Sequence, residues 1–186
     1  MAEFEPSSRL RKLFEIFAGT LPVQVPEFEV ISSYDVPPPY RDLLVHDQHM
    51  TVTLERFHRR PVELRVLARR VEGGEYARMI LLAIEGTDEI VEFGIFRMDL
   101  TTCNQEVQDE IVAGKTPLGR ILIQHDVLRR IDPTAFFRIW PNDTLKEWFG
   151  ISENQPVYGR LACIFCNNLL AIELLEVVRP EPPNAA

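Results

Sequence analysis

Three consecutive β-patterned runs between residues 62 and 98 constrain the fold of this chain more than any other feature. Residues 62–71 alternate apolar and charged side chains, and turns that contain glycine lead into further runs at residues 76–84 and 90–98. Connections this short join antiparallel neighbours. The sequence therefore predicts a meander of three antiparallel strands.

A second pair of strands is expected near the C-terminus. Residues 157–166 and 169–178 are β-rich, and they are separated by Asn167-Asn168, a dipeptide that tolerates the positive φ angles of a type I′ turn. Residues 136–140 are a further candidate strand. The two runs therefore predict a β-hairpin.

Helical patterns flank these strands, and a proline-rich connector at residues 20–41 carries one possible short strand near residues 28–31. The expected helices cover residues 7–17, 40–44, 51–58, 104–112, 117–122 and 143–148. The fold class is thus α+β, an antiparallel sheet meander with helices packed over it. We expect three parts: an N-terminal helix with the connector (1–41), one compact domain (42–178) and a disordered tail (179–186).

Composition excludes several classes of partner. The 186 residues are 46% hydrophobic and carry a net charge of −8, without a run of Lys or Arg long enough to make a basic patch. We therefore expect no nucleic-acid partner and no membrane. The longest apolar run, residues 79–84, is too short to cross a bilayer, and the start lacks a signal-peptide pattern. These features predict a cytoplasmic protein, which we expect to be a monomer.

No metal or organic cofactor is expected. Cys163 and Cys166 are three residues apart on a predicted strand, so their sulfurs point to opposite faces and cannot converge. The four histidines offer no placed third ligand for a metal ion; they are His46, His49, His58 and His125.

The turn around Gly114 has a backbone role. Gly114 should close the preceding helix, with Thr116 as the N-cap and Pro117 as the first residue of the next helix. The amides of Leu118 and Gly119 would then lie free at a helix N-terminus, where an anion is favoured. The same residues also fit a plain helix-turn-helix connection.

Two charged residues stand within apolar strands. Arg78 must either reach solvent from an edge strand or meet an anion. Glu173 is placed opposite Ala162 by a two-residue hairpin loop, with Arg160 on the same face. It is therefore either half of a structural ion pair with Arg160 or a group that contacts a ligand.

With these residues in place, the chain resembles the chorismate pyruvate-lyase family, whose members cut chorismate into 4-hydroxybenzoate and pyruvate. The resemblance implies a chorismate lyase-like domain at residues 42–178, with the family's antiparallel sheet and helices around a buried site. The matching pieces, in the family's order, are Met50-Thr51, Arg78 with Ile80-Leu81-Leu82 and Gly86, Gly114-Lys115-Thr116-Pro117-Leu118-Gly119-Arg120, Tyr158-Gly159-Arg160, and Leu170 with Glu173-Leu174.

The resemblance also implies an activity and its residues. Arg78, with main-chain groups at Met50 and Leu118, would bind the ring carboxylate, and Glu173 would meet the ring hydroxyl. The chain would then be a lyase for chorismate that needs no cofactor, with Arg78 and Glu173 as catalytic residues and a product used in ubiquinone biosynthesis. A desolvated Glu173 would have a raised pKa and act as a proton donor or a hydrogen-bond partner.

The alternative is a non-catalytic domain of the same fold that binds a small aromatic acid, since effector domains of some transcription regulators share this type of fold. The family's Trp-Gly-Arg-Arg is Tyr158-Gly159-Arg160-Leu161 here, which is compatible with binding without turnover. Against it, residues 1–50 hold one short helix and a proline connector rather than a DNA-binding pattern. A scaffold without a ligand would leave Arg78 and Glu173 exposed.

Overall fold

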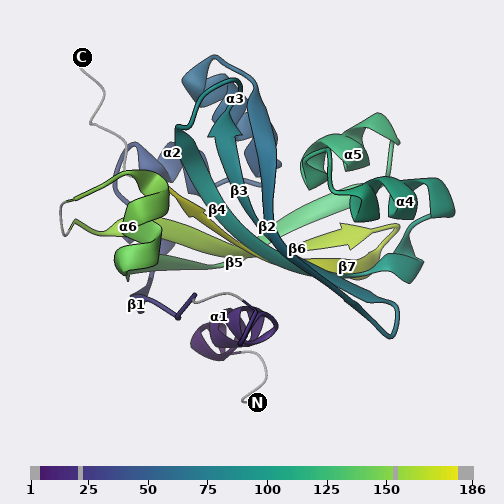
Figure 1. The fold of residues 1–186 in the computed structure, drawn as a ribbon, viewed down its shortest axis with the longest axis horizontal. Helices are drawn as coiled ribbons and strands as arrows, with labels where there is room; N and C mark the ends of the chain where they lie inside the picture. Colours follow the sequence, from purple (N-terminus) through teal and green to yellow (C-terminus); the bar gives the residue numbers. More distant parts are fainter. Residues whose placement is uncertain (1–4, 21–22, 153–154, 180–186) are drawn as a thin grey trace.

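A computed structural model describes residues 5–20, 23–152 and 155–179 and shows one seven-stranded antiparallel sheet in the order β1-β5-β6-β7-β4-β3-β2 (Figure 1). The strands are β1 (Glu27–Ile31), β2 (Val62–Glu72), β3 (Glu75–Ile84), β4 (Ile90–Asp99), β5 (Arg129–Trp140), β6 (Val157–Cys166) and β7 (Leu169–Val178). The predicted meander is confirmed as β2-β3-β4. A second meander, β5-β6-β7, joins it where β4 pairs with β7.

Helices cover both faces of the sheet, so the predicted α+β class is confirmed. Figure 1 shows α1 on one side of the sheet and α4 with α5 on the other. Disorder is expected for residues 179–186, of which residues 180–186 lie outside the described residues. The helices are α1 (Pro6–Glu15), α2 (Tyr40–Leu44), α3 (Met50–His58), α4 (Gln105–Ala113), α5 (Leu118–Gln124) and α6 (Asp143–Phe149), with short 3₁₀ turns η2 (Ser33–Asp35) and η3 (Leu100–Thr102).

Local turn chemistry sets most element boundaries. Asn167 and Asn168 have φ angles of 51° and 66°, as the predicted type I′ hairpin requires. Gly114 closes α4 in the left-handed conformation with φ 66°. The prediction that Thr116 caps α5 is wrong, because Pro117 has an extended backbone (φ −56°, ψ 139°) and is itself the N-cap. The helix therefore begins one residue later, at Leu118.

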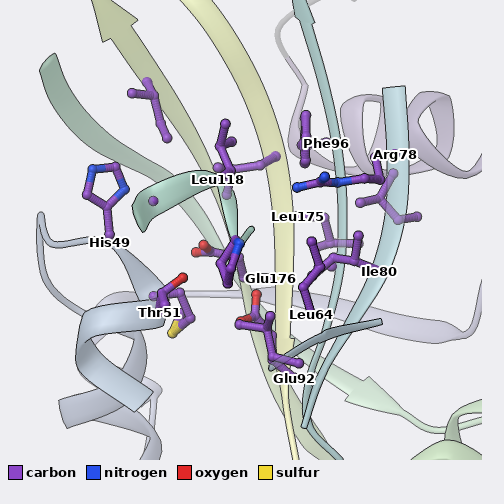
Figure 2. A pocket seen from close by; sticks show the side chains of 18 residues that line it. His49, Thr51, Leu64, Arg78, Ile80, Glu92, Phe96, Leu118, Leu175 and Glu176 are labelled. Carbon is purple, nitrogen blue, oxygen red and sulfur yellow. The ribbon is translucent and has the colours of Figure 1, made fainter. Parts of the chain in front are cut away.

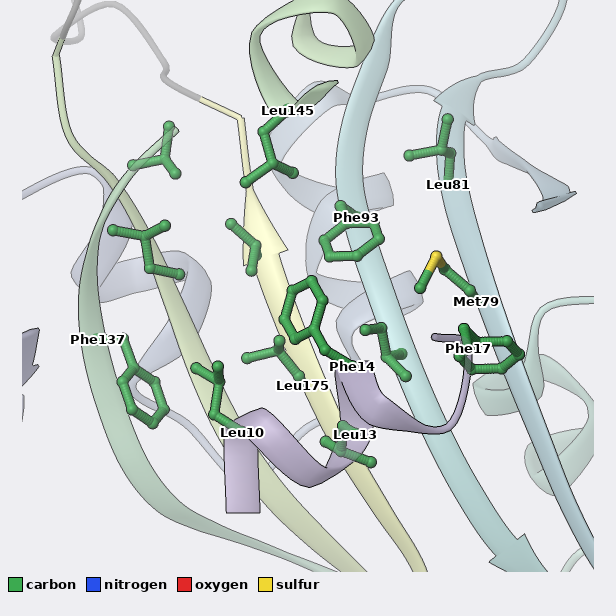
Figure 3. Close-up of a cluster of buried hydrophobic side chains, with 14 of the residues drawn as sticks. Leu10, Leu13, Phe14, Phe17, Met79, Leu81, Phe93, Phe137, Leu145 and Leu175 are labelled. Carbon is green, nitrogen blue, oxygen red and sulfur yellow. The ribbon is translucent and has the colours of Figure 1, made fainter. Parts of the chain in front are cut away.

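The main hydrophobic core lies between α1 and the sheet. Leu10, Leu13 and Phe14 of α1 point at the strands and pack near Phe93 and Phe137 (Figure 3). Residues from α6 complete the same cluster. The N-terminal helix therefore packs onto the sheet, and β1 from the connector extends that sheet beside β5.

The opposite face carries two smaller clusters of buried side chains. One forms around α4 and α5 and includes Phe96 and Ile111. The other forms around α2 and α3 and includes Tyr40 and Tyr158, whose ring centroids are 4.6 Å apart. Charged side chains are buried on this face, and they belong to the candidate site described below.

A β-bulge between β6 and β7 changes the predicted pairing. Phe165 pairs with Leu170 as the two-residue loop requires, but Ile164 pairs with Ile172, which leaves Ala171 as an extra residue on β7. Beyond the bulge Glu173 pairs with Cys163. The predicted pairing of Glu173 with Ala162 is therefore wrong by one residue.

Candidate ligand-binding cavity

A small cavity lies on the face of the sheet that α3 and α5 cover. Its volume is about 60 Å³. The apolar wall includes Leu64, Ile80, Leu82, Phe96, Leu118 and Leu174, and the polar side chains are His49, Thr51, Arg78, Glu92 and Glu176 (Figure 2). An apolar cavity with a few convergent polar groups is the usual form of a small-molecule site.

Arg78 is the buried cation of this cavity. It is 1% exposed and lies on β3, an inner strand between β2 and β4, so the interpretation as an edge-strand arginine that reaches solvent is wrong. Its Nη1 donates to the Ile111 carbonyl at 3.3 Å, and its guanidinium lies 5.1 Å from the centroid of the Phe96 ring. Among the described residues, Nε has no hydrogen-bond partner and no carboxylate forms an ion pair with Arg78.

Burial also lowers the pKa of Arg78, and the neighbouring Tyr76 partly offsets this effect. A guanidinium stays charged in proteins. Its burial without an anion among the described residues therefore lowers the stability of the fold. The arrangement is typical of a group that is held ready for an anionic ligand.

The first residues of α3 and α5 form one wall of the cavity. Met50 and Leu118, each the first residue of its helix, both line it. The helices approach closely at Gly119, where a Cβ atom would lie 2.9 Å from the Cβ of His49. Only glycine permits this approach, so Gly119 sets the position of the wall.

His49, which the sequence did not single out as a site residue, separates the cavity from a more open surface groove and lines both. It is 8% exposed, and its Nε2 accepts a hydrogen bond of 2.7 Å from Nε of Arg129. Burial, followed by the charges of Arg129 and Arg160, lowers the pKa of His49 to about 4. The ring is therefore neutral near pH 7.

Two carboxyl groups lie on the side of the cavity away from Arg78 (Figure 2). Glu92 on β4 is 3% exposed, and its Oε2 has no hydrogen-bond partner within the described part of the chain. Burial raises the pKa of Glu92 well above its usual range, and the charge of Glu176 adds to this effect. The signal used for Glu173, a carboxylate in an apolar strand, could also have found Glu92.

Arg160 holds the other carboxyl group in place. Its Nε donates to Oε2 of Glu176 at 2.6 Å. Its Nη1 donates to the carbonyls of Leu44 and His46 at 3.0 and 2.7 Å, and its Nη2 donates to that of Gln48 at 3.1 Å. Arg160 thus anchors the corner between α2 and α3, and the predicted ion pair between Arg160 and Glu173 is wrong.

Glu173 does not line the cavity. It faces α1, where it accepts a hydrogen bond from Arg9, and its Oε2 accepts one of 2.8 Å from Nε of Arg97 on β4. The bulge at Ala171 is the reason, because a shift of one residue turns a strand side chain to the other face. The structure therefore brings Arg78, Met50 and Leu118 together at one cavity and places Glu173 on the opposite side of the sheet.

The cysteines also lie on opposite faces, as predicted. Cys163 accepts a hydrogen bond from Arg9 of α1, whereas Cys166 belongs to the cluster around α4 and α5. Within residues 5–20, 23–152 and 155–179, no three His, Cys, Asp or Glu side chains gather in a way that could hold a metal ion. In the same ranges, no helix is both long and apolar enough to cross a membrane.

Comparisons with known proteins identify the fold. No family model and no curated protein matches the chain. Among solved structures, PhnF from Mycobacterium smegmatis is similar with a TM-score of 0.53 at 8% identity, over 94% of this chain and 95% of that one. The effector domain of PhnF gives a TM-score of 0.51 at 10% identity, over 71% and 88%. The ligand-binding domain of a putative GntR-family transcriptional regulator from Bordetella bronchiseptica gives 0.48 at 12% identity, over 66% and 92%.

These comparisons confirm the chorismate lyase-like α+β fold and correct the predicted activity. At such low identities the likeness shows the fold, and no sequence match supports membership of the chorismate pyruvate-lyase family. The prediction of an enzyme is contradicted, because a solved structure that matches the chain is described as the effector domain of PhnF. The predicted roles in chorismate cleavage and ubiquinone biosynthesis are therefore also unsupported.

Proposed function

We propose that this domain binds a small organic acid in the Arg78 cavity and does not convert it. The observation that carries the proposal is Arg78 itself, a buried guanidinium that has no carboxylate partner among the described residues. A ligand carboxylate would supply that partner through a bidentate pair of charge-assisted hydrogen bonds. Main-chain groups at Met50 and Leu118, which also line the cavity, would add further contacts to the ligand.

The apolar wall favours a ligand with a compact ring, such as an aromatic acid. Leu64, Ile80 and Leu82 from two strands would contact the faces of the ring. The cavity of about 60 Å³ is smaller than the ~150 Å³ that holds benzene in another protein, so a ring requires the wall to move. Met50 and Leu118, in the first turns of α3 and α5, form that wall.

The comparisons favour a regulatory use of such binding. One of the matching structures is described as the effector domain of PhnF. For this chain the same role would make the acid a signal rather than a substrate. A ligand that binds the folded state also raises its stability by mass action.

Calorimetric titration with benzoate and with cyclohexanecarboxylate tests the proposal. We expect binding of at least one acid by the wild type and a loss of tenfold or more in affinity for Arg78→Met. Arg138→Met is the matched control, because Arg138 pairs with Glu29 and is not among the residues that line the cavity. Equal affinities for wild type and Arg78→Met would overturn the proposal, as would recovery of a chemically altered acid after incubation.

A further inference from the structure

Glu92 and Arg78 stand at two ends of the same cavity. Arg78 pairs with Phe96 across β3 and β4, and Leu82 pairs with Glu92, so Glu92 lies four residues along β4 from the position opposite Arg78. At about 3.3 Å per residue, this places the two positions roughly 13 Å apart along the sheet. These are backbone positions, and the side chains of both residues line the cavity between them, so a single small ligand can contact both groups.

Burial and the charge of Glu176 raise the pKa of Glu92 and so favour its protonated form, whereas the charge of Arg160 lowers it. The charged groups that act on it are Glu176 on β7 and Arg160 on β6. Arg160 is already committed to Glu176 and to three backbone carbonyls. Glu176 is paired with that guanidinium, and a second carboxylate beside it is disfavoured by burial and by like charge. Glu92 is the neutral member of the pair.

A neutral carboxyl group is a hydrogen-bond donor as well as an acceptor. Oε2 of Glu92 is buried and has no partner among the described residues, which is costly unless something in the cavity completes the bond. The surrounding lining from Leu64, Leu82 and Gly94 offers it no side-chain partner.

We propose that Glu92 is the second recognition group of the cavity, donating a hydrogen bond to an oxygen acceptor on the ligand opposite the carboxylate that Arg78 holds. This inference rests on the proposed function and names its ligand class: small ring carboxylates that carry a carbonyl or similar oxygen across the ring. Arg78 selects for the charge, and Glu92 selects for the distal oxygen.

Two acids of nearly the same shape test this selection. In 4-oxocyclohexanecarboxylate the distal group is a carbonyl oxygen, and in 4-methylidenecyclohexanecarboxylate a CH₂ group replaces it. We expect the wild type to bind the oxo acid about tenfold more tightly. Glu92→Leu should remove this preference, whereas Glu92→Gln should keep part of it, because an amide also donates. Arg78→Met should weaken both acids alike.

The outcomes separate this inference from the function on which it rests. Equal binding of both acids by the wild type, with both still dependent on Arg78, would overturn the role of Glu92 and leave the proposed function standing. The role of Glu92 is likewise overturned if Glu92→Leu keeps the full preference for the oxo acid. Failure of the wild type to bind either of these acids, benzoate or cyclohexanecarboxylate would overturn both proposals.

Discussion

Nε of Arg160 lies 2.6 Å from Oε2 of Glu176, in a pair that joins β6 to β7 beside the buried Glu92. The same guanidinium donates to three carbonyls at the corner between α2 and α3. One side chain thus fixes both the polar end of the cavity and the segment that leads to Met50.

Replacing Arg160 should destabilise the fold strongly. Arg160→Met leaves Glu176 without its cation next to Glu92 and leaves three carbonyls without their donor. We expect the free energy of unfolding to fall by about 3–5 kcal/mol, measured by urea denaturation. The surface pair of Arg138 with Glu29 is the control, and Arg138→Met should cost about 0–1 kcal/mol. Comparable small losses in both variants would contradict the anchoring role of Arg160.

Replacing Arg78 should have the opposite effect on stability. Arg78→Met removes a buried charge that has no carboxylate partner among the described residues and keeps an unbranched, apolar side chain at that position. We expect the ligand-free protein to gain about 1 kcal/mol of stability while acid binding is lost, because binding sites commonly trade stability for function. Thermal unfolding with and without benzoate measures both effects. A strong loss of stability in the ligand-free variant would instead indicate a structural role.

Glu173→Gln should leave acid binding unchanged. Glu173 faces α1 and is paired with Arg9 and Arg97, so its replacement weakens the attachment of α1 to the sheet. We expect a loss of about 1–3 kcal/mol and faster hydrogen exchange in α1. A drop in affinity for benzoate comparable to that of Arg78→Met would return Glu173 to the binding site.

His49 should make stability depend on pH. Its pKa is about 4 in the folded protein, against 6.5 for an ordinary histidine, so the unfolded chain binds more protons between these values. Stability contributed by neutral His49 is therefore complete above pH 6.5 and is lost as the pH falls toward 4. Between pH 7 and pH 5 the loss should be about 2 kcal/mol.

The comparison with His49→Gln isolates this residue, because glutamine can still accept the hydrogen bond from Arg129. His46 and His58 also have lowered pKa values and act in the same direction, whereas Glu92, with its raised pKa, opposes them. The wild type should thus lose more stability than His49→Gln over this range. Parallel pH profiles for the two proteins would contradict a buried neutral His49.

Gly119→Ala should separate the first turns of α3 and α5. The added Cβ would lie 2.9 Å from Cβ of His49, closer than side-chain atoms tolerate. We expect a loss of about 1–3 kcal/mol in urea denaturation. In a His49→Gly background the clash disappears, so the same substitution should cost clearly less. An equal cost in both backgrounds would show that the strain arises elsewhere.

Much of the fold could be predicted from the sequence because it depends on neighbouring residues. The glycine turns set the β2-β3-β4 meander, Asn167-Asn168 sets the last hairpin through its positive φ angles, and Gly114 ends α4. Arg78 stood out for the same kind of reason, as a charge in an otherwise apolar strand. Such signals depend on a few neighbouring residues, so they can be read from the sequence without the tertiary structure.

The identity of the carboxyl group in the cavity was decided only by the tertiary structure. In sequence, Glu92, Glu173 and Glu176 are equivalent, since each is a carboxylate among apolar strand residues. A bulge at Ala171 turns Glu173 toward Arg9 and leaves Glu176 facing Arg160 and Glu92. A side chain changes face with a shift of one residue, and the packing of helices on both sides of the sheet selects the register. The sequence by itself determined the strands and turns, whereas the face of each acidic residue, and with it the chemistry of the cavity, came from long-range packing.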